Sequence, residues 1–292
     1  MTFINDLSST GRAVLTELGG SLVTIGQDGR GSGIVIDAGK VLTNAHNLRD
    51  RTTLVTFADG RAEQGTVTGA DEDGDLVVLE VDTGSVVPAA WAEQLPEAGD
   101  VVFALSRGGH RTRISFGMVS SVDVAFHGPR GRQVHGGIEH TAPLVRGSSG
   151  GPVATADGRV IGLNTHRTGR GFYVARPIDA ALQSTIADLA AGKSVVRPRL
   201  GVALAPPEVA AKLRASVGLP ERDGLLVRGV EQDGPAANAG IVEGDLLIAA
   251  GDTPLTSIES LHDVLAAVGE TLTLTVVRGT DERTVELSFA AG

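Results

Sequence analysis

Three separate segments of the sequence supply one residue each, a histidine, a carboxylate and a serine, in settings that suit acyl transfer. The serine is Ser149, which lies in the glycine-rich segment Gly147–Pro152, and His46 and Asp75 precede it in the chain. Attack by a serine hydroxyl needs an imidazole that takes its proton and a buried carboxylate that orients the imidazole. Glycines around the serine permit a sharp turn that aims consecutive N–H groups at a developing oxyanion.

Each of these candidates has an ordinary structural alternative when it is taken alone. A short Gly/Ser run is often only a turn, and a histidine at a strand end, such as His46, is usually a packed or surface residue. The acidic residues Asp71–Asp73 predict a solvated turn. Asp75 differs from them because it directly precedes the apolar run 76–79, where a carboxylate can be buried against an imidazole.

Short apolar or alternating segments must position these residues. They lie at 33–45, 53–60, 75–81, 100–106 and 159–166, each bounded by Gly, Asp or Asn, and this pattern predicts strands of a sandwich or barrel. One helix interrupts them: Pro177 suits its first turn, apolar residues recur from Ile178 to Leu189, and Gly192 can end it.

The sequence changes character from about Arg199. Strands are expected at 200–206, 224–230, 271–279 and 283–289, a tight turn with a short helical turn at 233–240, a hairpin at 244–255 and an amphipathic helix at 257–269. Residues 198–292 carry 7 basic and 14 acidic residues, a charge of −7, against −3 for residues 1–197. We therefore expect two domains, 1–196 and 197–292.

Composition excludes several functions. The net charge of −10 among 292 residues opposes nucleic-acid binding, and the basic residues Arg107, Arg111 and Arg113 are expected in a solvated loop. The absence of cysteine excludes thiolate chemistry and disulfides. No long apolar run and no secretory signal are visible, so the chain as it stands is expected in the cytoplasm, or exported if a leader is missing.

These segments resemble the HtrA (DegP-like) family of proteases. Gly147–Pro152 resembles its GNSGGP signature, with Ser148 in place of Asn; Thr43–His46 resembles its TNxH motif, with Asn47 replacing the apolar residue that follows; and residues 75–79 resemble its DLAVL segment. Gly31–Ile34, 113–120, 138–142 and 160–165 are similar to further family segments. The resemblance implies a mainly β fold, a trypsin-like double β-barrel followed by a PDZ domain.

The same resemblance assigns roles to individual residues. His46 is implied as general base, Asp75 as its orienting carboxylate and Ser149 as nucleophile, with the N–H groups of Gly147 and Ser149 as oxyanion hole. Thr165 would donate to Asp75, and His166 and Arg167 would present backbone to an extended substrate. The specificity pocket would have its base at Pro143 and Leu144 and its walls at Asn164–His166, which includes Thr165, and Gly171–Tyr173. Since the base lacks an acid, it predicts small or medium apolar residues at the cleavage site.

Residues 233–255 resemble the most recognisable stretch of PDZ domains. The resemblance implies that the N–H groups of Leu200, Gly201 and Val202 hold the terminal carboxylate of a bound peptide. Leu200, Val202, Leu261 and Leu265 would line the pocket for its last side chain. Ordinary strand and helix packing is the alternative for these leucines.

The sequence is thus expected to encode a serine endopeptidase that cleaves unfolded or damaged protein without ATP, metal or cofactor. Its expected partners are unfolded protein or peptide substrates and, at the PDZ domain, peptide C-termini; no nucleic acid and no membrane span is expected. The alternative functions are a chaperone, or a PDZ scaffold with little proteolytic activity. The family commonly forms homotrimers through aromatic N-terminal residues, and with only Phe3 present the assembly stays open.

Overall fold

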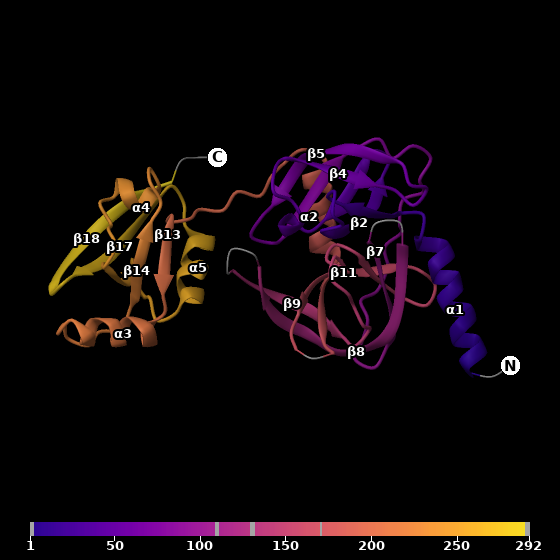
Figure 1. Ribbon diagram of the computed structural model, residues 1–292. Helices are drawn as coiled ribbons and strands as arrows, with labels where there is room; N and C mark the ends of the chain where they lie inside the picture. The colour runs from indigo at the N-terminus through magenta and orange to yellow at the C-terminus, as the bar shows by residue number, and fades with distance from the viewer. Residues whose placement is uncertain (1–2, 109–110, 129–131, 170, 290–292) are drawn as a thin grey trace. The chain divides into compact units, whose positions relative to one another are not determined.

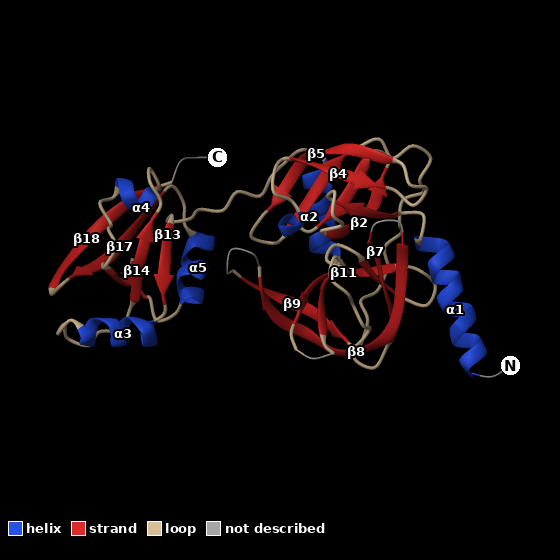
Figure 2. Cartoon of the chain, viewed as in Figure 1, coloured by secondary structure: helices blue, strands red, loops and turns tan. Residues whose placement is uncertain are grey.

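The computed structural model describes residues 3–108, 111–128, 132–169 and 171–289. The chain separates into two units, Met1–Val195 and Val196–Gly292, and in each of them strands predominate over helices (Figures 1 and 2). Among the described residues, no helix is long and apolar enough to span a membrane.

The first unit contains two closed six-stranded antiparallel barrels. Around the first barrel the strands are β1 (Leu22–Ile25), β2 (Gly31–Asp37), β3 (Lys40–Thr43), β6 (Leu76–Glu80), β5 (Ala62–Asp71) and β4 (Thr52–Thr56). Around the second they are β10 (Pro152–Ala154), β11 (Val160–Arg167), β12 (Tyr173–Pro177), β9 (Gln133–His140), β8 (Arg111–His127) and β7 (Val101–Gly108). The predicted trypsin-like double barrel is confirmed, although the segment 33–45 forms two strands rather than one.

One hydrophobic core joins the two barrels. It contains Leu42 and Leu76 from the first barrel, and Leu105 and Leu163 from the second, all of them fully buried. Burying apolar surface between the barrels fixes their relative position, since each side chain removed from water contributes about 2 kcal/mol. The segments that follow β3 and precede β10 are therefore held against each other.

Two helices pack on this core, where the sequence predicted one. The helix α1 (Phe3–Leu18) buries Val14 and Leu18 and was missed, although its apolar residues recur at helical spacing. The helix α2 begins at Ala180, later than expected. Asp179 caps it by accepting a hydrogen bond from the Leu182 N–H at 2.7 Å, while Pro177 ends β12.

Arg107 does not lie in a solvated loop, so that expectation was wrong. It belongs to β7 and is only 4% exposed, and Arg111 and Arg113 lie in the neighbouring strand β8. The Arg107 guanidinium donates to Thr112 Oγ1 at 2.7 Å and to the Ala58 carbonyl at 3.1 Å. Burial lowers the pKa of this guanidinium. Sequence could not show this, because Ala58 is remote in the chain.

In its described residues the second unit is an antiparallel sheet with helices, as the PDZ resemblance implied. The strand order is β13 (Val202–Ala205), β14 (Leu225–Val230), β15 (Leu246–Ala250), β17 (Thr271–Arg278) and β18 (Asp281–Ser288), with the short β16 (Thr253–Pro254) paired to β15. The helices are α3 (Pro207–Ser216), which the sequence analysis missed, α4 (Pro235–Asn238) and α5 (Ile258–Ala267). Leu261 and Leu265 of α5 pack into the core of this unit.

Candidate active site

His46 and Asp75 form a directly bonded pair in the first barrel. His46 lies in a short 3₁₀ turn (Ala45–Asn47) after β3, and Asp75 immediately precedes β6. Asp75 Oδ2 is 2.7 Å from His46 Nδ1, and its Oδ1 accepts the His46 backbone N–H at 3.0 Å. Because the ionised carboxylate can only accept, Nδ1 carries the proton and Nε2 is left as a base.

The Asp75 carboxylate is almost completely buried, with 1% of its surface exposed. Thr165 Oγ1 from the second barrel donates to Oδ2 at 3.1 Å, so three donors satisfy the buried charge. The backbone of Asp75 has a φ of +58°, in the left-handed region that only a few residue types tolerate. Its carbonyl accepts the Asn44 side-chain amide at 3.0 Å, which helps to hold this conformation.

The expectation for the acidic run before Asp75 was partly wrong. Asp71 is 1% exposed rather than solvated, and it is the last residue of β5. Its Oδ1 accepts the backbone N–H of Gly74 at 2.9 Å. This bond closes the turn that delivers Asp75 to His46, so Asp71 supports the site from within the fold.

The Ser149 turn depends on glycine at two positions. Gly147 has a φ of +83° and Gly150 one of +82°. A Cβ atom on Gly150 would lie 2.2 Å from the Ser32 carbonyl oxygen, and one on Gly147 would lie 2.7 Å from that of Gly29. Any larger residue would therefore push the turn away from the first barrel.

Ser32 and Asn47 hold this turn in place. The Ser32 backbone N–H donates to the Ser149 carbonyl at 2.9 Å, and its hydroxyl donates to the Gly147 carbonyl at 2.8 Å. The Asn47 side-chain amide donates to the same Ser149 carbonyl at 3.0 Å and to Thr43 Oγ1 at 2.9 Å. Sequence reasoning noted Asn47 as a departure from the apolar residue of the family, and this departure was the only signal that the sequence offered.

The Ser149 hydroxyl points to the second barrel rather than to His46. Its Oγ donates to the Thr165 carbonyl at 3.3 Å, and within the described residues it has no hydrogen bond to the imidazole. Thr165 therefore contacts both halves of the site, through its side chain to Asp75 and through its carbonyl to Ser149. Long or misaligned catalytic hydrogen bonds are common when no substrate is bound.

The expected oxyanion donors are unoccupied. Among the residues that the structure describes, no acceptor binds the backbone N–H of Gly147 or of Ser149. The Ser148 N–H is used instead within the turn and donates to the Val145 carbonyl at 3.3 Å. Two free donors beside a serine hydroxyl are what an oxyanion site requires.

A pocket of about 290 Å³ opens beside Ser149. Of the residues expected to form the specificity pocket, Leu144, Asn164, Thr165, His166 and Tyr173 line it, together with Val145, Arg146, Ser148, Ser149 and Arg167. Pro143 and Gly171, which the resemblance implied, are exposed and are not among these lining residues. The Pro143 carbonyl instead accepts the Ser115 hydroxyl at 2.7 Å.

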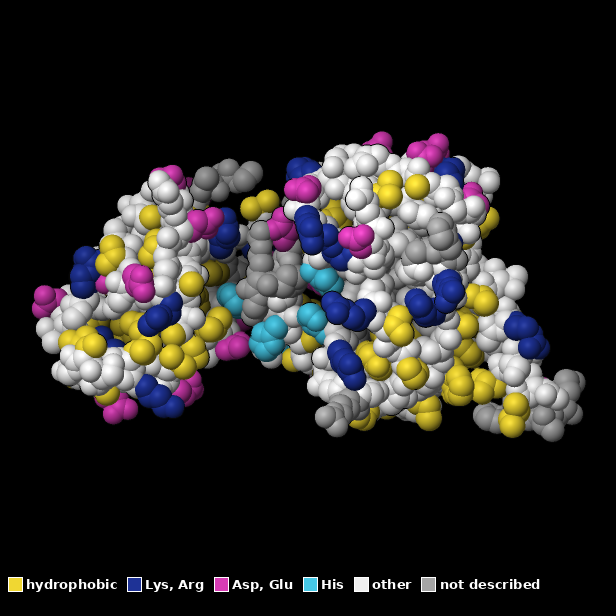
Figure 3. All heavy atoms as spheres, viewed as in Figure 1, with side chains coloured by type: hydrophobic (Ala, Val, Ile, Leu, Met, Phe, Trp, Pro, Cys, Tyr) yellow, Lys and Arg dark blue, Asp and Glu magenta, His cyan; other side chains and the backbone are white. Residues whose placement is uncertain are grey.

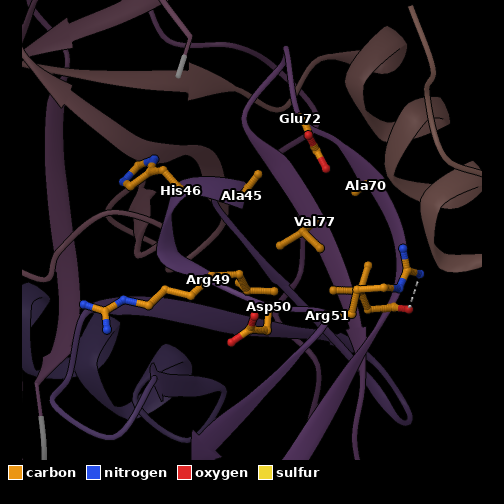
Figure 4. Close-up of a pocket in the computed structure, with 10 residues that line it drawn as sticks. Ala45, His46, Arg49, Asp50, Arg51, Ala70, Glu72 and Val77 are labelled. Carbon is orange, nitrogen blue, oxygen red and sulfur yellow. Dashed lines mark hydrogen bonds between the residues drawn. The ribbon is translucent and has the colours of Figure 1, made fainter. Parts of the chain in front are cut away.

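A second cavity of about 500 Å³ is lined by His46 and by residues of the first barrel and its loops. Figure 4 shows the His46 ring turned away from Val77 and Ala70, whereas the Glu72 side chain points toward these two residues. Its lining carries both signs of charge, from Arg49 and Arg51 and from Asp50 and Glu72.

A buried histidine that the sequence analysis overlooked supports the backbone next to Ser149. His140 is fully buried, and its Nε2 is 3.0 Å from Asn164 Oδ1. The Asn164 amide nitrogen donates to the Gly151 carbonyl at 3.0 Å, so its oxygen is the acceptor and His140 Nε2 carries the proton. Burial lowers the pKa of His140, and the Asn164 hydrogen bond and the Glu139 charge offset part of this effect.

In the second unit, the loop before β13 presents backbone donors. Gly201 has a φ of +76°. The Leu200 carbonyl accepts the Ala236 N–H at 2.9 Å and the Gly201 carbonyl accepts the Glu231 N–H at 2.8 Å. These bonds fix the carbonyls, while the Leu200 and Gly201 N–H groups have no acceptor within the described part of the chain. Leu200 itself packs into the core with Leu261 and Leu265.

Comparison with known proteins agrees with this architecture. The trypsin-like peptidase domain matches residues 31–163, and the PDZ domain matches residues 226–278. The fold and the site thus define a trypsin-like serine endopeptidase that carries a PDZ domain.

Individual relatives identify the family of serine proteases to which the chain belongs. HhoA of Synechocystis sp., named as a putative serine protease, is 34% identical over 273 residues, covering 86% of this chain and 68% of that protein. The serine endoprotease DegS of Escherichia coli is 29% identical over 274 residues, covering 89% and 76%. The solved structure of the HtrA-type protease AlgW with a decapeptide has a TM-score of 0.64 at 22% identity, covering 95% of this chain and 97% of that one. The chain belongs to the HtrA family of serine proteases.

Proposed function

We propose that His46, Asp75 and Ser149 are the catalytic triad of this endopeptidase. The observation that carries the assignment is the buried Asp75 carboxylate, bound at once to the ring and to the backbone of His46. An isolated buried carboxylate is costly, so a partner imidazole that becomes positive during the reaction is the group that this site favours.

In the proposed reaction, substrate binding turns the Ser149 hydroxyl from the Thr165 carbonyl to His46 Nε2. His46 accepts the proton while Oγ attacks the peptide carbonyl, and Asp75 stabilises the imidazolium. The N–H groups of Gly147 and Ser149 bind the oxyanion. His46 then protonates the leaving amine, and water hydrolyses the acyl-enzyme by the same route. No step requires a metal or a cofactor.

We infer that the substrate is an extended, unfolded segment. It would add as a strand to the end of β11, and an apolar side chain would fill the pocket beside Leu144 and Val145. Lys or Arg would fit poorly, because none of the described lining residues is acidic. Residues 197–292 would act as a PDZ domain that binds peptide C-termini at Leu200, Gly201 and Val202, separate from the protease domain 1–196.

A serine-directed fluorophosphonate probe tests the assignment. We expect mass spectrometry to locate one label, on Ser149, and casein to be cut in the same preparation. A wild-type protein that is neither labelled nor active would instead favour a chaperone or scaffold role. Measuring how well the wild type and the Ser149→Ala variant suppress aggregation of an unfolded protein then identifies a chaperone.

A further inference from the structure

The pocket beside Ser149 is basic, although the whole chain is strongly acidic. Arg146, His166 and Arg167 line it, and none of its ten described lining residues is acidic, whereas the chain carries a net charge of −10. Figure 3 shows histidine side chains gathered beside several Lys and Arg side chains on one face of the first unit. A local reversal of charge at a cleft attracts ligands of the opposite sign.

The fold indicates where an extended substrate meets this charge. One edge of β11 pairs with β12, through His166 with Val174 and Arg167 with Tyr173. On the other edge the pairing with β10 ends at Leu163, and only Asn164 is bonded beyond it, to the backbone at Gly150 and Gly151. The edge at 165–167 is therefore available for a further strand.

The register follows from the contact of Ser149 with Thr165. Because Ser149 Oγ touches the Thr165 carbonyl, the substrate residue whose carbonyl is attacked pairs with Thr165. Every strand pair of this barrel is antiparallel. A substrate strand that pairs antiparallel to β11 in the same way has the residue two positions before the attacked one opposite Arg167. Side chains at such opposite positions are close enough to interact.

Arg167 is available to a carboxylate. Its side chain is exposed, its guanidinium lies over the Tyr173 ring with 5.8 Å to the centroid, and its Nε donates to the Gly169 carbonyl at 2.9 Å. These contacts orient the group without neutralising it, and no described carboxylate pairs with it. The acid Glu139 on β9, two strands away from β11, is bonded to Ser120 and Thr168.

We propose that the protease prefers Asp or Glu two residues before the residue whose carbonyl is attacked, and that the Arg167 guanidinium binds this carboxylate. The proposal rests on the proposed function of Ser149. Arg146 adds positive potential at the same pocket. An exposed pair of opposite charges contributes little free energy, so the expected preference is about threefold for Glu over Gln and about tenfold for Glu over Lys.

The test uses the full chain and three quenched-fluorescence peptides. They share one sequence with Val at the cleaved position, carry Glu, Gln or Lys two residues earlier, and are amidated so that the PDZ domain gains no terminal carboxylate. We expect kcat/KM to fall in the order Glu, Gln, Lys, with the ratios shrinking at high salt. Arg167→Gln should bring the ratios close to one. Arg159→Gln, an exposed change directly before the first residue of β11, should preserve them.

Two results would overturn the inference: equal cleavage of the three peptides by the wild type, or a preference that survives Arg167→Gln and disappears in Arg146→Gln. The peptide Kd of the Ser149→Ala protein, measured by fluorescence anisotropy, supplies a readout that does not need catalysis. We expect this Kd to be lowest for the Glu peptide and highest for the Lys peptide. Failure of Ser149 labelling would count against the proposed function alone, whereas the charge order tests Arg167.

Discussion

The hydroxyl of Ser149 donates to the backbone carbonyl of Thr165, 3.3 Å away, and Thr165 donates through its own hydroxyl to Asp75. One residue of the second barrel thus contacts the proposed nucleophile and the proposed orienting carboxylate. The alignment of the site therefore depends on how the two barrels pack. The hydroxyl groups of Ser148, Ser149 and Thr165 have different contacts, so removing each of them should change the rate of cleavage differently.

Replacing Ser149 by Ala should abolish casein cleavage while the protein stays folded. In a serine protease with a Ser-His-Asp triad, loss of a triad member leaves only about 10³–10⁴-fold catalysis over water. Ser148→Ala is the matched control, because Ser148 is 3% exposed and its hydroxyl has no hydrogen-bond partner among the described residues. It should keep most of the rate. Substantial cleavage by the Ser149 variant, with circular dichroism unchanged in both, would remove Ser149 from the mechanism.

Replacing Thr165 by Val should lower kcat while KM changes little. The variant keeps the carbonyl that contacts Ser149 but removes the donor to Asp75 Oδ2. A hydrogen bond to a charged group contributes about 1.5 kcal/mol or more, so a loss of about tenfold is expected. Thr165→Ser, which restores the hydroxyl, should recover most of the rate in steady-state assays on one peptide. A Ser variant as slow as the Val variant would show that packing, not the hydrogen bond, matters.

His140 should make the first unit less stable in mild acid. Burial lowers its pKa below the ordinary value of 6.5, so the unfolded chain takes up a proton at a higher pH than the folded one. Stability is therefore complete above about pH 6.5, falls as the pH drops toward the folded-state pKa, and levels off below it. Urea unfolding at pH 5 and pH 8 measures the difference.

Two variants control for the other histidines. His140→Gln should reduce the difference between the two pH values, whereas replacing His135, which is exposed on the same strand, should leave it unchanged. If the His140 and His135 variants show the same difference as the wild type, the acid sensitivity arises elsewhere.

The PDZ unit should bind peptides through their terminal carboxylate, independently of the protease. Ser194 and Val195 are bonded to Ala70 of β5, so residues 1–196 keep these contacts and should retain Ser149 labelling. Residues 197–292 should bind peptides with an apolar C-terminal residue at micromolar Kd. Amidating that terminus removes the charge and should weaken binding sharply in a fluorescence titration. Equal binding of both peptide forms would refute the role of the loop at Leu200–Val202.

Sequence sufficed for what depends on residue type and local pattern. The strand pattern predicted a sandwich or barrel. The resemblance carried by the glycines around Ser149, the apolar run after Asp75 and the PDZ-like stretch implied the double barrel and the PDZ sheet. The contacts that complete the site join segments remote in the chain. Ser32 and Asn47 bind the Ser149 carbonyl across more than a hundred residues, and nothing in the local pattern reveals that pairing.

Two errors have the same physical origin. Asp71 and Arg107 were expected in solvent because charged residues are rarely buried without partners. Each has a partner that only the folded chain supplies, the Gly74 N–H for Asp71 and the Ala58 carbonyl for Arg107. Similarly, His140 was unremarkable in the sequence because its importance comes from Asn164, which lies on another strand.

The left-handed backbone at Asp75 has an evolutionary consequence. Asparagine tolerates this conformation as well as aspartate does, and its amide could accept from the His46 backbone and donate to the ring at Nδ1. The ring would then carry its proton on Nε2 and could no longer accept one from Ser149. The Thr165 hydroxyl, which donates to Asp75 Oδ2 in this structure, would instead accept from the amide NH₂, so the substitution would leave the fold in place. A descendant of this chain could thus become a pure binding protein by exchanging one oxygen for one NH₂ group, and its architecture would keep no record of the change.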